Sequence, residues 1–246
     1  MNKKVILVTG SSIGLGSTII YEAAKRGYNV VINYLTHEKE ALQLKEKVEK
    51  EFKIEALVIK CDITNENDIK NMIEKVINVF GKLDVLVNNA GISIDNDFNL
   101  KTKKEFMRVL EVNTVGTFLV SRIVGNNMLN HKSGKIINIS SNNGIDSYYE
   151  YGLDYDASKA AVINLTHNLA NHYAPYINVN CVCPGWINTP MNKDMDTDFK
   201  KNQENKILLG RFAEPIEIAN TVLFLASSEA NYINDSIIKV DGGIKC

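Results

Sequence analysis

Short runs of apolar, mostly β-branched residues recur along the chain, and longer stretches of mixed polarity separate them. The seven runs are KVILVT, NVVINY, EALVIK, LDVLVN, GKIINIS, INVNCVCP and SIIKVD. Their lengths are typical of strands. They are apolar throughout instead of alternating, as in strands that are covered on both faces. We therefore expect about seven buried β-strands.

The intervening stretches, such as 38–52 and 66–80, carry apolar residues at steps of three and four, which predicts helices. Strands that alternate with helices in this way imply βαβ crossovers. We therefore expect an α/β protein with a Rossmann-type, doubly wound parallel sheet of about seven strands and helices on both faces. No linker, repeat or low-complexity tract interrupts the pattern, so residues 1–246 are expected to form a single domain.

Residues 190–206, PMNKDMDTDFKKNQENK, are polar and charged and follow a Pro-Gly pair. Two interpretations remain open for this stretch. It is either a solvated helix and loop or a mobile lid over a site.

Composition narrows the function classes. Apolar residues make up 45% of the 246 residues, enough for a sizeable core, and the formal net charge of −1 gives no electrostatic reason to expect nucleic acid or an anionic membrane as a partner. No segment approaches the roughly 20 apolar residues of a membrane span. The four cysteines include no C-x-x-C pair, and the four histidines lack metal-ligand spacing. We expect a soluble, cytoplasmic protein without a metal.

A glycine-rich stretch, VTGSSIGLG, follows the first predicted strand and opens a helix. It places Gly10, Gly14 and Gly16 around Ser12 and Ile13. Glycines at this point let the backbone turn tightly and approach a pyrophosphate, whose charge the helix N-terminus favours. The spacing is G-x-x-x-G-x-G, without the Lys-Ser/Thr pair of a P-loop. Its place in a βαβ unit favours dinucleotide binding over a purely conformational role.

The end of the second strand bears on the choice of dinucleotide. An acid there would bind the ribose 2′-hydroxyl of NAD and repel the 2′-phosphate of NADP, but this chain has Asn33, with Thr36 shortly after it. Because no carboxylate is present to repel the 2′-phosphate, the charge at this position favours NADP(H). No arginine is present to bind the phosphate, so NAD(H) is the alternative. Asp62, followed by Ile63, either bonds an adenine edge or forms a turn, and both interpretations stay open.

Polar residues stand at the ends of the fourth and fifth predicted strands and at the start of the helix that follows the fifth. NNAG (88–91) ends the fourth strand, Ser140 and Ser141 end the fifth, and Tyr155 and Lys159 lie one helical turn apart. Carboxyl ends of parallel strands form the edge where ligands of open α/β sheets bind. A Y-x-x-x-K pair alone is weak evidence, but together with the glycine loop it predicts a catalytic site.

These segments carry a specific resemblance. The chain is similar to short-chain dehydrogenases/reductases over essentially its whole length, and the matching segments are TGSSIGLG, NNAG, VNTVGTF, INISS, YDASK and PGWINT. The resemblance implies a catalytic tetrad of Asn113, Ser141, Tyr155 and Lys159. It also implies cofactor contacts, besides Tyr155, Lys159 and the glycine loop, at Asn89, Ala90, Gly91, Pro184, Gly185, Ile187 and Thr189.

One detail departs from the family pattern. The family's serine usually lies thirteen residues before its tyrosine, whereas Ser141 lies fourteen and Ser140 fifteen before Tyr155. We choose Ser141 because Gly144 then falls at its usual place. One extra residue therefore lies in IDSYYEYGLD (145–154), on the substrate side.

The resemblance implies a role for each member of the tetrad. Tyr155 would be the general acid in reduction and the base in oxidation, and Ser141 would bond the substrate oxygen. A free phenol titrates near 10, and we expect Lys159 and the positive nicotinamide to lower that pKa. Lys159 would also hold the nicotinamide ribose, and Asn113 a water linking the lysine to solvent.

Within the family, GISIDN and the tail LLGRFAEPIEIANTVLFLASSEANYINDSIIKVDGGI most resemble 3-oxoacyl-[acyl-carrier-protein] reductases. An acidic acyl-carrier protein needs basic residues near the site mouth; Lys132 fits one expected position, but NLANHYAPYINV offers no Lys or Arg. The alternatives are a dehydrogenase/reductase of a sugar, polyol, steroid or other small alcohol, and a catalytically silent dinucleotide-binding regulator. The presence of all four tetrad residues argues against the regulator hypothesis. A homotetramer is implied by the resemblance.

For the aromatic residues near the predicted site, two structural interpretations remain open. Trp186, after the Pro-Gly pair, packs either on the cofactor or lid or in the core. Tyr148, Tyr149 and Tyr151 either line a substrate pocket or cover an oligomer surface.

Overall fold

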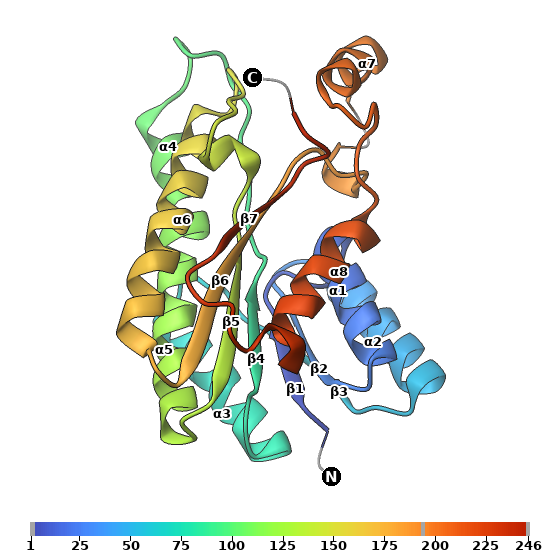
Figure 1. Ribbon diagram of the computed structural model, residues 1–246, viewed down its shortest axis with the longest axis vertical. Coiled ribbons are helices and arrows are strands. Elements are labelled where there is room, and N and C mark those ends of the chain that lie inside the picture. Colours follow the sequence, from blue (N-terminus) through green and yellow to red (C-terminus); the bar gives the residue numbers. More distant parts are fainter. Residues whose placement is uncertain (1–2, 193–194, 245–246) are drawn as a thin grey trace.

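A twisted parallel sheet of seven strands, in the order β3-β2-β1-β4-β5-β6-β7, forms the centre of the computed structural model, which describes residues 3–192 and 195–244 (Figure 1). The strands are β1 Val5–Val8, β2 Asn29–Tyr34, β3 Ala56–Lys60, β4 Val85–Asn88, β5 Gly134–Ile139, β6 Ile177–Pro184 and β7 Ile237–Val240. All six pairings are parallel. The predicted strands and the Rossmann-type fold class are confirmed.

Helices cover both faces of the sheet (Figure 1). One layer consists of α1 Gly14–Lys25, α2 Glu38–Phe52 and α8 Pro215–Ala226. The other consists of α3 Glu66–Phe80, α5 Thr117–Asn130 and α6 Leu153–Tyr173. The helices predicted at 38–52 and 66–80 are confirmed with these bounds. Among the described residues, none of the helices combines the length and apolar character needed to cross a membrane.

The first strand shows why the strands read as apolar without alternation. Ile6 and Val8 pack into the core beneath α1, α2 and α8, while Val5 and Leu7 pack into the opposite core beneath α3, α5 and α6. Successive side chains of a strand point to opposite faces. Both faces are buried here, so both must be apolar.

The strand order reverses between the neighbouring strands β1 and β4, although all strands are parallel. Crossovers from β1 lead outward to β2 and β3, while those from β4 lead to β5, β6 and β7. The loops at the carboxyl ends of β1 and β4 therefore diverge, and a crevice opens between them. This is the usual ligand site of a doubly wound sheet.

Before β5 the chain forms one continuous helical segment that contains a π-helix. α4, Lys103–Leu110, continues through a π-helix, Glu111–Gly116, into α5. π-Helical turns are rare and concentrate at functional sites. This one carries Asn113, a predicted member of the tetrad.

Several short helical segments lie outside the two helical layers. α7, Thr197–Lys206, stands apart from the two helical layers (Figure 1). Three short 3₁₀ turns complete the described structure, at Asn142–Gly144, Pro190–Asn192 and Ser228–Ala230. Residues 193 and 194 of the stretch 190–206, expected as either a solvated helix and loop or a lid, lie outside the described residues. Around them the stretch 190–206 forms the second 3₁₀ turn and α7, which has no fully buried side chain.

Candidate active site

A cavity of about 870 Å³ lies at the carboxyl edge of the sheet, in the crevice between β1 and β4. The glycine loop, the loops after β2 to β6 and the start of α6 line it. Every cofactor-binding and catalytic residue named from the sequence lies on its lining except Asn113. A pocket of this size and position is typical of a small-molecule or cofactor site.

The glycine loop has the shape that a dinucleotide needs. Gly14 has a φ of +60°, which favours glycine, and a Cβ built on it would lie 3.9 Å from Thr189 across the cavity. A Cβ built on Gly16 would lie 2.6 Å from Asn89 Nδ2, so no side chain fits there. Asn89 Nδ2 also donates to the carbonyls of Thr9 and Gly10 at 2.9 and 3.1 Å. The backbone beside the start of α1 is thus open to a pyrophosphate.

The two polar residues expected at the adenosine end make contacts within the fold. The Asn33 side chain is buried; its Oδ1 accepts from the Gly10 amide at 2.9 Å and its Nδ2 donates to the Cys61 carbonyl at 3.1 Å. Asp62 accepts from the amide and hydroxyl of Thr64 at 2.9 and 2.7 Å, as a turn-forming aspartate does. Asn33 therefore joins the glycine loop to β3, and its side chain is not free for a ribose.

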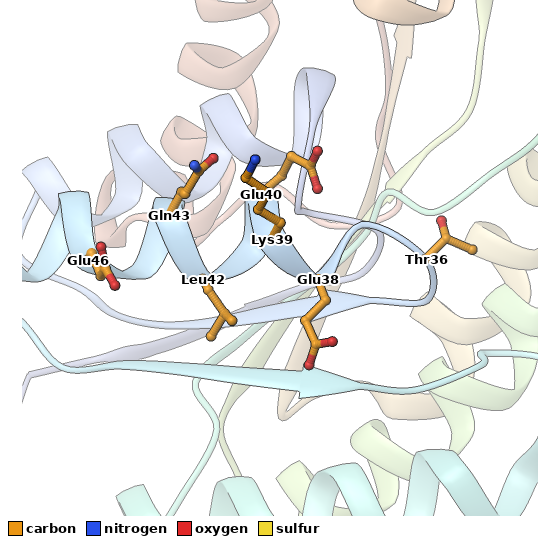
Figure 2. A pocket seen from close by; sticks show the side chains of 7 residues that line it. All are labelled: Thr36, Glu38, Lys39, Glu40, Leu42, Gln43 and Glu46. Carbon is orange, nitrogen blue, oxygen red and sulfur yellow. The ribbon is translucent and has the colours of Figure 1, made fainter.

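A shallower hollow of about 500 Å³ adjoins this end, beside Thr36 and the first turns of α2 (Figure 2). Three of its lining residues are glutamates, and Lys39 is the one cation among them. The glutamate nearest to β2, Glu38, accepts from the Tyr34 hydroxyl at 2.6 Å and points away from Lys39 (Figure 2). The described residues therefore hold no arginine here.

The two serines after β5 point to different places. Ser140 Oγ donates to the Lys159 carbonyl at 2.6 Å and is buried, so it fastens β5 to α6. Ser141 lines the cavity, and its hydroxyl is hydrogen-bonded to Tyr155. Gly144 packs directly on α6, since a Cβ on it would lie 2.7 Å from the Lys159 backbone. These contacts support Ser141 as the family's serine.

Tyr155 and Lys159 lie together in the cavity, with Lys159 Nζ 5.4 Å from the centre of the Tyr155 ring. Burial raises the pKa of Tyr155 to about 12, and the Ser141 hydrogen bond opposes that rise. Burial lowers the pKa of Lys159 to about 8. The expectation of a lowered phenol pKa is therefore not met by the protein alone, because desolvation of the phenolate outweighs its stabilisation. The phenol is poised as an acid.

Lys159 is held by the end of β5 and faces open space beside Gly91. Its Nζ donates to the Ile139 carbonyl at 2.9 Å, and a Cβ built on Gly91 would lie 3.5 Å from the same nitrogen. The missing side chain at Gly91 thus leaves room above the ammonium, where a ribose or a nicotinamide would fit. The residues present suit a nicotinamide dinucleotide.

Asn113 lies behind the cavity lining, in the π-helical segment. Its Oδ1 accepts from the Ile92 amide at 2.8 Å, and its Nδ2 donates to the Ile92 carbonyl and Ser158 Oγ, both at 2.9 Å. The side chain therefore fastens the loop after β4 to α6. In this structure Asn113 acts on the site by holding the two elements together.

A buried ion pair that the sequence did not reveal stands directly before Tyr155. Lys101 Nζ is 3.1 Å from both carboxylate oxygens of Asp154, and the side chains are 5% and 0% exposed. The same ammonium donates to the Ile94 carbonyl, while Asp154 Oδ1 accepts from the Tyr155 amide at 3.0 Å. The pair thereby fixes the loop after β4 against the first turn of α6. The partners are 53 residues apart, so no local pattern signals them.

Breaking this pair is expected to destabilise the fold. Lys101→Met leaves the Asp154 carboxylate buried without its counter-charge, and such losses typically cost about 3–5 kcal/mol. Urea unfolding of the single variant and of Lys101→Met/Asp154→Asn measures the effect. The double variant should regain a large part of the loss, since no charge remains buried. Equal destabilisation of both variants would contradict the assignment.

Aromatic side chains border the cavity on the substrate side. The rings of Tyr149, Trp186 and Phe199 pack edge-on, with centroids 6.0 to 6.2 Å apart. Trp186 also stacks on Phe212 at 5.5 Å. Tyr149 lines the cavity, as the pocket interpretation expects, whereas Tyr148 is 87% exposed. Trp186 also lines the cavity, and it contacts both Phe199, within the stretch 190–206, and the buried Phe212, so contacts of the lid and the core interpretation are both present.

Asp95 and Asn143, also on the lining, were not singled out from the sequence. Both follow strands at the carboxyl edge, Asp95 within GISIDN and Asn143 two residues after INISS. A systematic search of polar residues in the loops that follow strands could have found them.

Lys132 does not lie near the site mouth of its own chain. It belongs to the turn between α5 and β5, whereas Ser141 follows the opposite end of β5. The strand therefore separates the two, and the expectation of a basic residue at the mouth is wrong for Lys132 within one chain.

Comparisons with known proteins agree with this geometry. A family model described as "Enoyl-(Acyl carrier protein) reductase" matches residues 10–245. A 3-oxoacyl-[acyl-carrier-protein] reductase of Staphylococcus epidermidis is 39% identical over 245 residues, 99% of each chain, and the Staphylococcus aureus protein of that name is 38% identical over 242 residues, 98% of each.

Solved structures agree as well. A 3-oxoacyl-[acyl-carrier protein] reductase of Brucella melitensis superposes with a TM-score of 0.92 at 29% identity, over 100% of this chain and 92% of that one. A dehydrogenase/reductase of Sinorhizobium meliloti gives 0.92 at 31% identity, over 99% and 95%. With its glycine loop, tyrosine and lysine gathered in one cavity, the chain belongs to the short-chain dehydrogenase/reductase family of NAD(P)-dependent oxidoreductases.

Proposed function

We propose that this enzyme reduces the keto group of 3-oxoacyl thioesters to a secondary alcohol, with NADPH as the electron donor. The observation that carries the proposal is the meeting of Ser141, Tyr155 and Lys159 at one end of a cavity whose other end begins at the glycine loop. The names of the relatives that match over nearly the full chain support the thioester as substrate. An acyl-carrier protein as the carrier and a homotetrameric assembly belong to the same proposal and rest on that likeness.

Each residue contributes to one half of the reaction. NADPH, when bound, supplies the hydride that the carbonyl carbon receives. Ser141 donates a hydrogen bond to the carbonyl oxygen as negative charge develops there. Tyr155 transfers its phenolic proton to that oxygen, so that one hydride and one proton complete the alcohol. Lys159 stabilises the phenolate left behind, and the proton is then restored from solvent.

The preference for NADPH follows from the end of β2. Thr36 and His37 follow this strand on the cavity lining, and the Glu38 carboxylate is held by the Tyr34 hydroxyl. A 2′-phosphate therefore meets no unpaired carboxylate in its expected position. An aspartate at Thr36 would restore the repulsion.

The test measures initial rates of NADPH and NADH oxidation in parallel, with acetoacetyl-coenzyme A as substrate. We expect kcat/KM to be about tenfold or more higher with NADPH, and Thr36→Asp to reduce that ratio because it brings a charge against the 2′-phosphate. A preference for NADH in the wild-type enzyme would overturn the cofactor proposal.

The same assay separates the alternatives. Turnover of sugars, polyols or steroids without turnover of the thioester would overturn the substrate. Cofactor binding without turnover of any carbonyl compound would favour a silent regulator.

A further inference from the structure

The cavity wall beyond the catalytic residues is built around Tyr149. The Tyr149 amide donates to Asp156 Oδ2 at 2.8 Å, and its hydroxyl is hydrogen-bonded to Asp95. Ser93 Oγ donates to the same aspartate at 2.6 Å. Tyr149 thus connects the loop after β5 to the loop after β4 across the substrate side.

This wall is held rigidly on the remaining sides. Asn143 Nδ2 donates to Asp156 Oδ1 at 2.7 Å, which fixes the carboxylate that receives the Tyr149 amide. A Cβ built on Gly152 would lie 3.0 Å from Tyr149 Cδ1, so the loop is packed directly against the ring. Phe199 of α7 covers both Tyr149 and Trp186. A ring fixed at its backbone, its hydroxyl and its faces cannot yield easily to a bulky ligand.

The lining on this side mixes polar and aromatic side chains with a few aliphatic ones. The loops after β4, β5 and β6 contribute the polar and aromatic Ser93, Asp95, Asn142, Asn143, Tyr149, Trp186 and Asn192. The aliphatic residues from the same loops are Ala90, Ile92, Ile187 and Pro190. A long alkyl chain gains binding energy mainly by burying methylene groups against apolar surface. Along Asp95 and the three asparagines it would instead displace water from carboxylate and amide groups without replacing their hydrogen bonds.

We infer that Tyr149 and Trp186 restrict the substrate to short 3-oxoacyl groups of about four carbons, and that Tyr149 is the residue that sets this limit. The inference rests on the proposed function, because it narrows the acyl group of the same thioester. The polar groups around the wall suit a short, hydrated acyl group. The rigid Tyr149 ring occupies the space that a longer acyl chain requires.

The test compares kcat/KM for acetoacetyl-, 3-oxooctanoyl- and 3-oxododecanoyl-coenzyme A with NADPH. Coenzyme A thioesters keep docking of a carrier protein out of the measurement. The wild-type enzyme is expected to prefer the four-carbon substrate by about tenfold or more, since a few methylene groups without a matching pocket have effects of this size. Tyr149→Ala should reduce this preference about tenfold by opening the wall, and Trp186→Ala should act in the same direction.

Two matched variants isolate the effect of the ring. Tyr148→Ala removes the exposed neighbour in the same loop and should leave the preference unchanged. Tyr149→Phe keeps the ring but loses the bond to Asp95, so the short-chain preference should persist.

The outcomes separate this inference from the proposed function. Equal rates for all three chain lengths in the wild type, or an unchanged preference in folded Tyr149→Ala and Trp186→Ala, would overturn the inference and leave the proposed function standing. No turnover of any thioester would overturn the proposed function itself.

Discussion

Tyr155→Phe is expected to lower kcat/KM for carbonyl reduction by about a thousandfold, within the range attributed to a positioned general acid. The substitution removes one hydroxyl and keeps the ring that packs beside Lys159. Because burial holds the pKa of this phenol at about 12, it stays protonated across the physiological range, as the proposed proton donor must. Steady-state rates with NADPH and acetoacetyl-coenzyme A measure the loss.

Cofactor binding serves as the control for this variant. The glycine loop and Gly91 are untouched, so the Kd of NADPH, followed by its fluorescence, should change by no more than about twofold. A variant that binds NADPH and still turns over at more than about a tenth of the wild-type rate would exclude Tyr155 as the acid.

Lys159→Met is expected to lower kcat/KM by about a hundredfold or more, because it removes the cation that stabilises the phenolate. The substitution should also shift the pH dependence of alcohol oxidation. Loss of a positive charge near Tyr155 raises the pKa of the phenol, so the rate of alcohol oxidation should rise only at higher pH than in the wild type. An unchanged pH profile for oxidation would contradict this role.

The same variant has a second readout in stability. The pKa of Lys159 is about 8 in the folded protein, below its ordinary value of 10.5. Between these values the unfolded chain binds more protons, so the free energy of unfolding should rise with pH. Relative to Lys159→Met, the wild type should gain on the order of 3 kcal/mol between pH 8 and 10.5. Chemical unfolding without cofactor measures the difference.

The strands and the two helical layers could be predicted from the sequence because the burial that creates them is repetitive. In β1, Ile6 and Val8 serve one core and Val5 and Leu7 the other, so a short unbroken apolar run is itself the signal. The place of the site followed from the parallel arrangement, since the carboxyl ends of parallel strands lie at one edge of the sheet.

The roles of individual polar side chains depended on contacts that no local pattern contains. Ser140 and Ser141 are adjacent and chemically identical. The position of Gly144 favoured Ser141, but only the structure shows that Ser140 bonds to the Lys159 carbonyl and Ser141 to Tyr155. The end of the second strand was recognised, but Asn33 proved to be a buried connector of the glycine loop to β3.

Electrostatic effects were the hardest to anticipate. Burial raises the pKa of Tyr155 against the opposing Ser141 hydrogen bond, whereas the sequence spacing shows only the nearby Lys159. The Lys101–Asp154 pair joins segments 53 residues apart, and Lys132 is separated from the site by the length of β5. Sequence spacing reveals neither the Lys101–Asp154 contact nor the distance of Lys132 from the site, because both depend on the three-dimensional path of the chain.

The most direct test of the account follows a label from the cofactor to the product. NADPH carrying deuterium at both C4 positions is incubated with acetoacetyl-coenzyme A and either the wild-type enzyme or Tyr155→Phe, and the product is analysed by mass spectrometry. We predict 3-hydroxybutyryl-coenzyme A with one deuterium from the wild type and almost none from the variant. Unlabelled product, equal yields from both proteins, or no product from an enzyme that binds NADPH would contradict the account.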